Sequence, residues 1–360
     1  MVVLEDTSPN GNIQAVVEQD ERVAYFTLYP NEETGEPVKS CWVRNLVPAP
    51  ARVDVDALHE GRPALMPKGA CAHPNGEAPL DPETLRILWL EEGDGAVLID
   101  ETSVDEEVLA FIPGFAGLDG FPGYARDSVS EHALAWPLDD DVEDVWGRID
   151  EAIEYWESWQ DTTTWPALQD RLMDTYEAVF GAHERYYAID GGMWPPRALI
   201  RVQTPDAWVL LTLGVCIRRQ PKVELAGDAA DASPRVELAM ALEPDVDELT
   251  LRRAMTYLSV QSSYPWTRYH WLGDGHTSSC DAFPQIGESP GFPATLLTRA
   301  PLGAPRVAMP DYRGPVDLLW LVPITEGERA YAIAEGSPAL MRRLALNGPY
   351  WIHRRARATS

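Results

Sequence analysis

The chain has 360 residues, of which 45% are hydrophobic and 13 are Trp, so it can form two well-packed domains and is not globally disordered. Its 57 Asp and Glu residues against 29 Lys and Arg residues give a formal net charge of −28, which repels phosphate backbones and argues against nucleic acid as a partner. No apolar run of 18 residues exists and no basic segment leads into an apolar one near Met1, so we expect a cytoplasmic protein without a membrane span.

The acidic charge has two interpretations. It can attract a basic partner, for example a nuclease with a positively charged cleft, because complementary fields accelerate encounter. It can also serve solubility or adaptation to salt. The four cysteines are widely spread and form no CxxC pair, so we expect free thiols and no disulfide framework.

Residues 1–138 are predicted to form a β-rich domain. Segments 13–17 and 22–29 flank a run of turn formers and predict a hairpin. Further strands are predicted at 41–46, 85–90, 96–99 and 108–112, and a short helix at 53–60.

Segment 113–127 carries glycines at positions 114, 117, 120 and 123. A Gly-rich loop can hold phosphate when a strand precedes it, a helix follows it and a lysine is present. Here Phe115, Phe121 and Tyr124 interleave with the glycines, so we favour a structured loop that packs aromatic rings over a nucleotide site.

The acidic run Asp139, Asp140 and Asp141 marks the predicted boundary between domains 1–138 and 139–360. Two amphipathic helices are predicted next. The first, at 142–159, has a Trp-rich buried stripe. The second, at 165–180, is capped by Thr164 and ended by Gly181, and its buried face is predicted to contain Leu168, Leu172, Tyr176 and Val179. A strand is then predicted at 186–189.

The centre of the second domain is predicted to be an antiparallel meander within residues 197–242. Segments 198–203 and 235–242 alternate between apolar and polar residues, whereas 208–215 is apolar almost throughout, as in a strand covered on both faces. Beyond it we predict a helix at 248–259, strands at 293–298 and 316–324, and a helix that opens at Ser337 and ends at Gly348.

From about residue 165 to 353 the order of these motifs resembles the suppressor of fused domain, which bacterial members share with the N-terminal part of the animal protein. The matching pieces are Trp208-Val-Leu-Leu-Thr-Leu-Gly-Val215, Arg235-Val-Glu-Leu-Ala-Met-Ala-Leu242, Leu272-Gly-Asp-Gly-His-Thr277, Ala294-Thr-Leu-Leu-Thr298, Leu319-Trp-Leu-Val-Pro-Ile-Thr325, Gly336-Ser-Pro-Ala-Leu340 and Tyr350-Trp-Ile-His353.

The resemblance implies an α+β domain with a central mixed, mainly antiparallel sheet flanked by helices, preceded here by the smaller β-rich domain. It also implies a domain that binds other proteins and has no known catalytic centre. The animal protein holds an extended peptide by strand addition, and bacterial relatives act largely as immunity proteins. Leu213 stands where animal members have Tyr, and the animal C-terminal lobe is absent, so its peptide clamp does not transfer.

The most site-like local cluster is Asp274 and His276 with Cys280 nearby. A Cys–His nucleophile needs an orienting group and an oxyanion hole, so we favour a loop histidine that bonds to the backbone. Cys71 and His73 could form a zinc site with His276 and Cys280 only if the two domains met there. No GxSxG, HExxH or Walker motif is present, so we expect no catalytic residue, no cofactor and no metal.

The sequence therefore predicts a protein-binding module rather than an enzyme. The first hypothesis is a bacterial immunity protein that blocks a basic toxin by direct binding. A regulatory scaffold that sequesters a transcription factor or other endogenous protein is the alternative, and an enzyme of unrecognised type is the third. The candidate contact residues are Trp194, Leu213, Asp274 and His276.

Overall fold

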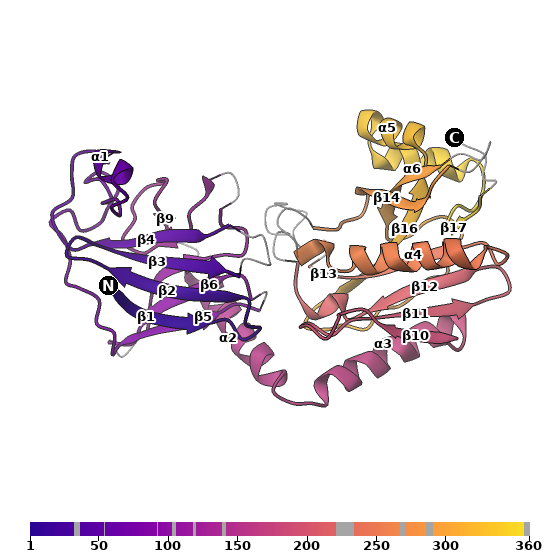
Figure 1. Ribbon diagram of the computed structural model, residues 1–360, viewed down its shortest axis with the longest axis horizontal. Helices are drawn as coiled ribbons and strands as arrows, with labels where there is room; N and C mark the ends of the chain where they lie inside the picture. The colour runs from indigo at the N-terminus through magenta and orange to yellow at the C-terminus, as the bar shows by residue number, and fades with distance from the viewer. Residues whose placement is uncertain are drawn as a thin grey trace. The chain divides into compact units, whose positions relative to one another are not determined.

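The computed structural model describes residues 1–31, 37–53, 55–91, 93–102, 106–117, 120–138, 142–220, 234–266, 271–285 and 291–355. The chain divides into two compact units, Met1–Asp161 and Thr162–Ser360, whose elements are labelled in Figure 1. No helix in the described ranges is both long enough and apolar enough to cross a membrane.

The first sheet of the N-terminal unit has the strand order β1-β2-β3-β4. Its strands are β1 (Val2–Thr7), β2 (Ile13–Gln19), β3 (Val23–Pro30) and β4 (Lys39–Asn45), and each pairs antiparallel with the next. The predicted hairpin is β2–β3. Strand β1 was not predicted, because its side chains are mostly exposed and three of its six residues are polar.

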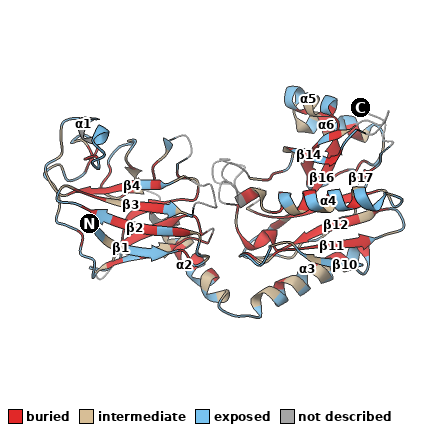
Figure 2. Cartoon of the chain, viewed as in Figure 1, coloured by how far each residue is buried: buried red, intermediate tan, exposed pale blue. Residues whose placement is uncertain are grey.

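The second sheet of this unit has the order β5-β6-β7-β8-β9. Its strands are β5 (Leu85–Trp89), β6 (Ala96–Asp100), β7 (Glu107–Ile112), β8 (Tyr124–Ala125) and β9 (Trp136–Pro137), and the short helix α1 (Val55–His59) precedes them. One apolar core contains side chains of both sheets, among them Phe26 and Trp42 from the first and Leu98 from the second. The β-rich N-terminal domain is thus two sheets around a shared core (Figure 2).

Helix α2 (Val142–Ser158) covers the other face of the second sheet. Val145 and Ile149 of the helix pack with Val97 and Ile99 of β6. Strand β6 is apolar on both faces because the shared core lies on one side and α2 on the other. This packing puts the division between the units after Asp161 and not at the expected position, after residue 138.

The Gly-rich segment leads into strand β8 and not into a helix, so it lacks the helix that a phosphate loop requires. Its aromatic rings pack together: Phe121 lies 5.3 Å from Phe115, 5.1 Å from Tyr124 and 5.0 Å from Trp136 between ring centroids. Lys39 Nζ holds the start of the segment through the carbonyl of Gly114, at 2.8 Å. Residues 118 and 119 lie outside the described residues.

The C-terminal unit is built on an eight-stranded sheet of order β10-β11-β12-β13-β16-β15-β14, with β17 pairing with β13. The strands are β10 (Arg185–Ala188), β11 (Ala198–Gln203), β12 (Trp208–Leu213), β13 (Arg235–Leu242), β14 (Thr277–Phe283), β15 (Phe292–Thr298), β16 (Val316–Ile324) and β17 (Ile352–His353). Strands β11, β12 and β13 form the predicted meander. The sheet is mixed because β13 runs parallel to β16 and β17.

Helices cover both faces of this sheet. They are α3 (Thr164–Phe180), α4 (Glu248–Gln261), α5 (Glu326–Glu335) and α6 (Ser337–Ala345), with short 3-10 turns η3 (Val215–Ile217) and η5 (Tyr264–Trp266). Every second residue of β13 packs with Leu251 and Leu258 of α4; these strand residues are Val236, Leu238, Met240 and Leu242. On the other face, Tyr176 of α3 donates a hydrogen bond to the carbonyl of Thr212 at 3.1 Å. The α+β architecture expected from the sequence is confirmed.

Several details of the C-terminal unit differ from the sequence-based predictions. Helix α3 begins at Thr164, which was expected to cap it, and Phe180 is buried in place of Val179, which is 37% exposed. Strand β14 and helix α5 were not predicted. All eight residues of β13 are buried, although only one face was expected to be.

Candidate functional site

The strand directions place the four predicted contact residues at one end of the sheet. The strand pairings, followed across the sheet from Ala198↔Leu213 to Thr277↔Leu296, show that β11 and β14 begin at this end and that β12 finishes at it. We call it the Leu213 end. Trp194 precedes β11, Leu213 closes β12, and Asp274 and His276 precede β14. They share an end but not a cluster, because β13, β16 and β15 separate β12 from β14.

Leu213 is fully buried, so its side chain is not accessible to a partner in this structure. Trp194 is half-buried. The turn after Leu213 is held by a buried carboxylate: Glu237 accepts hydrogen bonds from Thr212 Oγ1 (2.6 Å) and from the backbone N–H groups of Gly214 (2.8 Å) and Cys216 (3.1 Å). Burial raises the pKa of Glu237, and these donors oppose the rise. This network is structural.

The loop 271–276 is fixed on several sides. Asp274 is exposed but accepts a hydrogen bond from the backbone N–H of Arg299 at 2.8 Å. His276 Nδ1 lies 3.2 Å from the carbonyl of Trp271, and its ring packs edge-on against that indole at 4.4 Å. The side chain of Gln220 both donates to and accepts from the backbone of Leu272. These contacts agree with the interpretation of His276 as a backbone-bonded loop residue.

The thiol near this loop is not activated. Burial raises the pKa of Cys280 to about 11, so little thiolate exists at neutral pH. Burial also lowers the pKa of His276, which keeps its ring neutral. All four cysteines are buried and free. Cys71 and His73 belong to the N-terminal unit, whereas His276 and Cys280 belong to the C-terminal unit, so neither unit by itself holds the four-residue zinc site.

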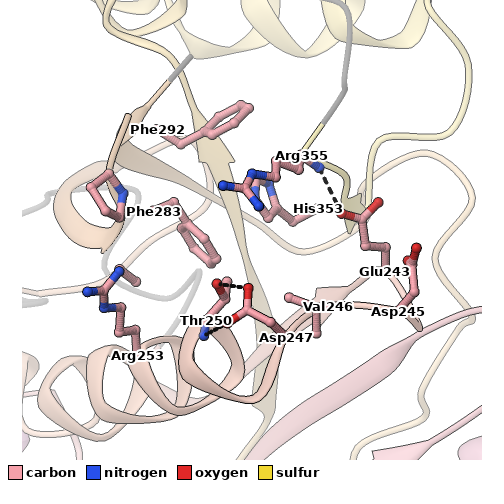
Figure 3. A pocket seen from close by; sticks show the side chains of 12 residues that line it. Glu243, Asp245, Val246, Asp247, Thr250, Arg253, Phe283, Phe292, His353 and Arg355 are labelled. Carbon is pink, nitrogen blue, oxygen red and sulfur yellow. Dashed lines mark hydrogen bonds between the residues drawn. The ribbon is translucent and has the colours of Figure 1, made fainter. Parts of the chain in front are cut away.

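A cavity of about 270 Å³ opens at the opposite end of the same sheet, which we call the His353 end (Figure 3). Its lining comes from the loop after β13, the start of α4, the end of β14, the start of β15, and the chain around β17. The lining residues are Glu243, Asp245, Val246, Asp247, Thr250, Arg253, Ala282, Phe283, Pro284, Phe292, His353 and Arg355.

The cavity combines an aromatic wall with a charged rim. The ring of His353 lies between Phe283 and Phe292, with centroids 4.3 Å and 4.6 Å away. Glu243 accepts a hydrogen bond from the backbone N–H of Arg355 at 3.2 Å, as Figure 3 shows.

Asp247 caps helix α4 by accepting from the N–H and the hydroxyl of Thr250, and these bonds lower its pKa. Its carboxylate is therefore ionised at neutral pH and is committed to the helix start. Asp245, at the same rim, is exposed. Arg253 and Arg355 also line the cavity, so its three carboxylates and two guanidinium groups leave one negative charge. Together with the aromatic wall, that balance favours a cationic side chain over an anionic one.

A second hollow of about 650 Å³ adjoins the cavity and shares Arg253 and Ala282 with it. It runs between helix α4 and strand β14. Its other lining residues are Arg252, Thr256, Tyr257, Val260, Gln261, Ser279, Cys280, Asp281 and Pro293. We call the two hollows together the edge groove.

Strand β14 forms the outer wall of the edge groove and lies at the edge of the sheet. Within the described part of the chain it pairs with β15 alone. An edge strand presents backbone N–H and C=O groups to which another strand can add. The edge groove thus offers a backbone edge together with a side-chain cavity at its end.

No pattern in the sequence indicated this groove. Strand β14 reads Thr-Ser-Ser-Cys-Asp-Ala-Phe, and its polar first half hides the alternation of buried Ser278, Cys280 and Ala282 with exposed Ser279 and Asp281. The remaining walls come from elements far apart in the chain. The only local clue was Asp247 followed by Thr250 before an apolar helix, which is a helix-start pattern and says nothing about a site.

Comparison with known proteins identifies the C-terminal unit. Residues 194–358 match the family model described as Suppressor of fused protein (SUFU). A solved structure titled "the Sufu-Fu complex crystal structure" matches with 16% identity, covering 54% of this chain and 91% of that chain, at a TM-score of 0.36. No curated protein matches the chain. The resemblance inferred from the sequence is thus confirmed: the chain carries a suppressor-of-fused domain over residues 194–358, preceded by a β-rich N-terminal unit.

Proposed function

We propose that this protein is a binding module whose suppressor-of-fused domain holds another protein. The family match over residues 194–358 carries this proposal, because that family consists of protein-interaction scaffolds and is not known for enzymes. The thiol and histidine that looked most reactive in the sequence support it further, since burial keeps both in their neutral forms.

The finer proposal is a bacterial immunity protein that acts in the cytoplasm and neutralises a basic toxin by covering it. The net charge of −28 supports a basic partner, because such a field raises the association rate with a positively charged protein. Specificity must come from shape and a few close contacts, since charge alone attracts any basic protein.

The edge groove is the place we propose for the partner. An extended segment would pair with the backbone of β14, and a Lys or Arg side chain of that segment would enter the cavity at the His353 end. There its charge would face Glu243 and Asp245, and its stem would lie against Phe283. The four residues proposed from the sequence lie at the other end of the sheet, where only Trp194, Asp274 and His276 are accessible.

The test has two stages. The tagged protein is first used to capture its partner from its own organism at low salt, with a wash at moderate salt, and the retained protein is identified by mass spectrometry. We expect one basic protein whose toxicity is relieved when the two are produced together. Capture of a transcription factor would support the proposed binding module but contradict the proposal that the protein is an immunity protein. Retention of no specific protein would contradict both.

The second stage locates the partner on the surface. Asp245→Lys reverses a charge at the cavity mouth, and Asp174→Lys makes the same change at an exposed position of α3, so the effect on net charge is identical. We expect Asp245→Lys to weaken binding about tenfold or more by calorimetry, and Asp174→Lys only slightly. Equal losses in the two variants would mean that the groove is not the contact.

A further inference from the structure

A group of side chains in the N-terminal unit has the composition of a metal site. His73, Glu77 and Asp127 each offer one ligand atom, and these atoms lie within 4.8 Å of one another. His73 Nδ1 is 2.9 Å from Glu77 Oε1, and His73 Nε2 is 3.9 Å from Asp127 Oδ1. Two ligands of one ion, each about 2.1 Å from it, lie roughly 3 to 4 Å apart, so small side-chain movements would bring the three onto a common ion.

The backbone around the three residues is fixed independently of their side chains. The N–H of Ala72 donates to the carbonyl of Asp127 at 2.8 Å, which ties the segment before His73 to the segment that carries Asp127. The N–H of Glu77 donates to the carbonyl of Asn45 at 2.9 Å. Both segments are therefore held in place before any ligand arrives, and this lowers the cost of binding one.

The buried carboxylate of Asp127 provides a second, independent observation. Asp127 is only 3% exposed, and its Oδ2 atom accepts no hydrogen bond. Arg44 Nε lies 3.7 Å from this oxygen, within ion-pair distance but too far for a hydrogen bond, and this Nε has no acceptor of its own. A buried carboxylate oxygen without a hydrogen-bond donor is costly, and the distant Arg44 guanidinium compensates it only in part, so a closer cation at this oxygen would be favourable.

The surrounding charges set how strongly a cation can bind. Asp127 Oδ1 accepts from Arg126 Nε at 2.8 Å, and Arg44 NH1 lies 3.6 Å from Glu77. Arg126 also pairs with Glu107. With a neutral His73, the carboxylates of Glu77, Glu107 and Asp127 and the guanidinium groups of Arg44 and Arg126 sum to one negative charge. A divalent cation is therefore attracted, although the two guanidinium groups oppose its binding.

We propose that His73, Glu77 and Asp127 form a zinc-binding site of moderate affinity. One imidazole and two carboxylates are the mixture that Zn²⁺ accepts more readily than Mg²⁺ or Ca²⁺, which prefer oxygen ligands alone. Water completes the coordination, because His73 is exposed and Glu77 half-buried, so the ion is reachable from solvent. The site lies within the N-terminal unit and does not depend on the protein-binding function of the other unit.

The test is titration of the full-length protein with Zn²⁺ by calorimetry. We expect one site that His73→Ala weakens about tenfold or more, because it removes one of three protein ligands. His59→Ala removes an exposed histidine from the same unit and serves as the matched control, with no expected change. Both histidines are exposed, so neither variant threatens the fold.

A second variant separates a cation site from a plain ion-pair network. Arg126→Gln removes a positive charge beside Asp127, so a bound Zn²⁺ should become severalfold tighter. Equal Zn²⁺ affinity in the wild type and in His73→Ala would overturn the proposal. So would weak binding that Arg126→Gln does not improve, which would leave these residues as a network of ion pairs only.

Discussion

Replacement of the buried Glu237 tests how the Leu213 end of the sheet is held together. In the folded protein this carboxylate accepts from Thr212, Gly214 and Cys216, and Glu237 itself is fully buried. In Glu237→Ala two backbone N–H groups lose their acceptor, at about 1–3 kcal/mol each. The Thr212 hydroxyl can turn to the carbonyl of Leu238, 3.3 Å away, so its loss is smaller. We expect a total cost of about 3–5 kcal/mol.

Glu237→Gln should be much milder, at about 0–2 kcal/mol. Its amide oxygen can accept from both N–H groups, and its amide nitrogen can donate to Thr212 Oγ1. Urea unfolding read through the hydrogen exchange of β12 and β13 amides reports the C-terminal unit specifically. Glu335→Gln, the same change at an exposed position of α5, is the control and should stay within about 0.5 kcal/mol.

The pH dependence follows from the direction of the shift. Burial raises the pKa of Glu237, so the folded state holds a proton that the unfolded state has released once the pH exceeds about 4.3. The stability advantage of the wild type over Glu237→Gln should therefore be largest below that pH and decline as the pH rises through the folded pKa. An advantage that grows from pH 4 to pH 7, or a Gln variant as unstable as the Ala variant, would refute this reasoning.

Two further substitutions test the fold, Gly214→Ala in the C-terminal unit and Lys39→Met in the N-terminal unit. Gly214→Ala should cost about 2–4 kcal/mol of stability, because Gly214 has φ +94° and a Cβ there would lie 2.4 Å from a backbone oxygen. The control Gly327→Ala, at a helix position with open space around it, should be neutral or stabilising. Equal urea unfolding midpoints for the two variants would contradict this prediction. Lys39→Met should cost about 2–4 kcal/mol of stability and increase hydrogen exchange in residues 113–117, because Lys39 is only 3% exposed and its ammonium donates to two buried carbonyls. The control Lys68→Met, at an exposed position, should change neither quantity. An unchanged exchange rate in Lys39→Met would show that the ammonium does not support that segment.

The sequence predicted the strands that are apolar and missed those that are not. Strand β12 was found because both of its faces are buried, and its continuous apolar run follows directly from that burial. Strand β14 was missed because polar residues occupy both its buried and its exposed positions, Ser278 among the buried and Ser279 and Asp281 among the exposed. Helix α5 buries only Glu328 and Ala332, so it has no apolar stripe, although Thr325 and Glu328 form a capping box that could have been read from the sequence.

The candidate site was less predictable than the fold. Sequence reasoning selected residues from the best-matching motifs, and motifs that specify a fold are rich in core and turn residues such as Leu213 and Asp274. The edge groove depends on how α4, β14 and β17 meet, and those elements are separated in the chain. Glu237 is one of two charged residues in strand β13, and its full burial, which the alternating pattern of the segment did not predict, makes it a structural carboxylate.

The pairing of β13 has a consequence for how the chain reaches its native state during synthesis. Strands of the N-terminal unit pair mostly with their immediate neighbours in sequence, so that unit can fold while the ribosome is still translating the rest. Strand β13, by contrast, needs β16 beside Arg235–Ala239 and β17 beside Ala241–Leu242. Until residues 316–353 have emerged, its apolar edge is open to other nascent chains. We therefore expect the C-terminal unit to be more prone than the N-terminal unit to non-native association before synthesis is complete.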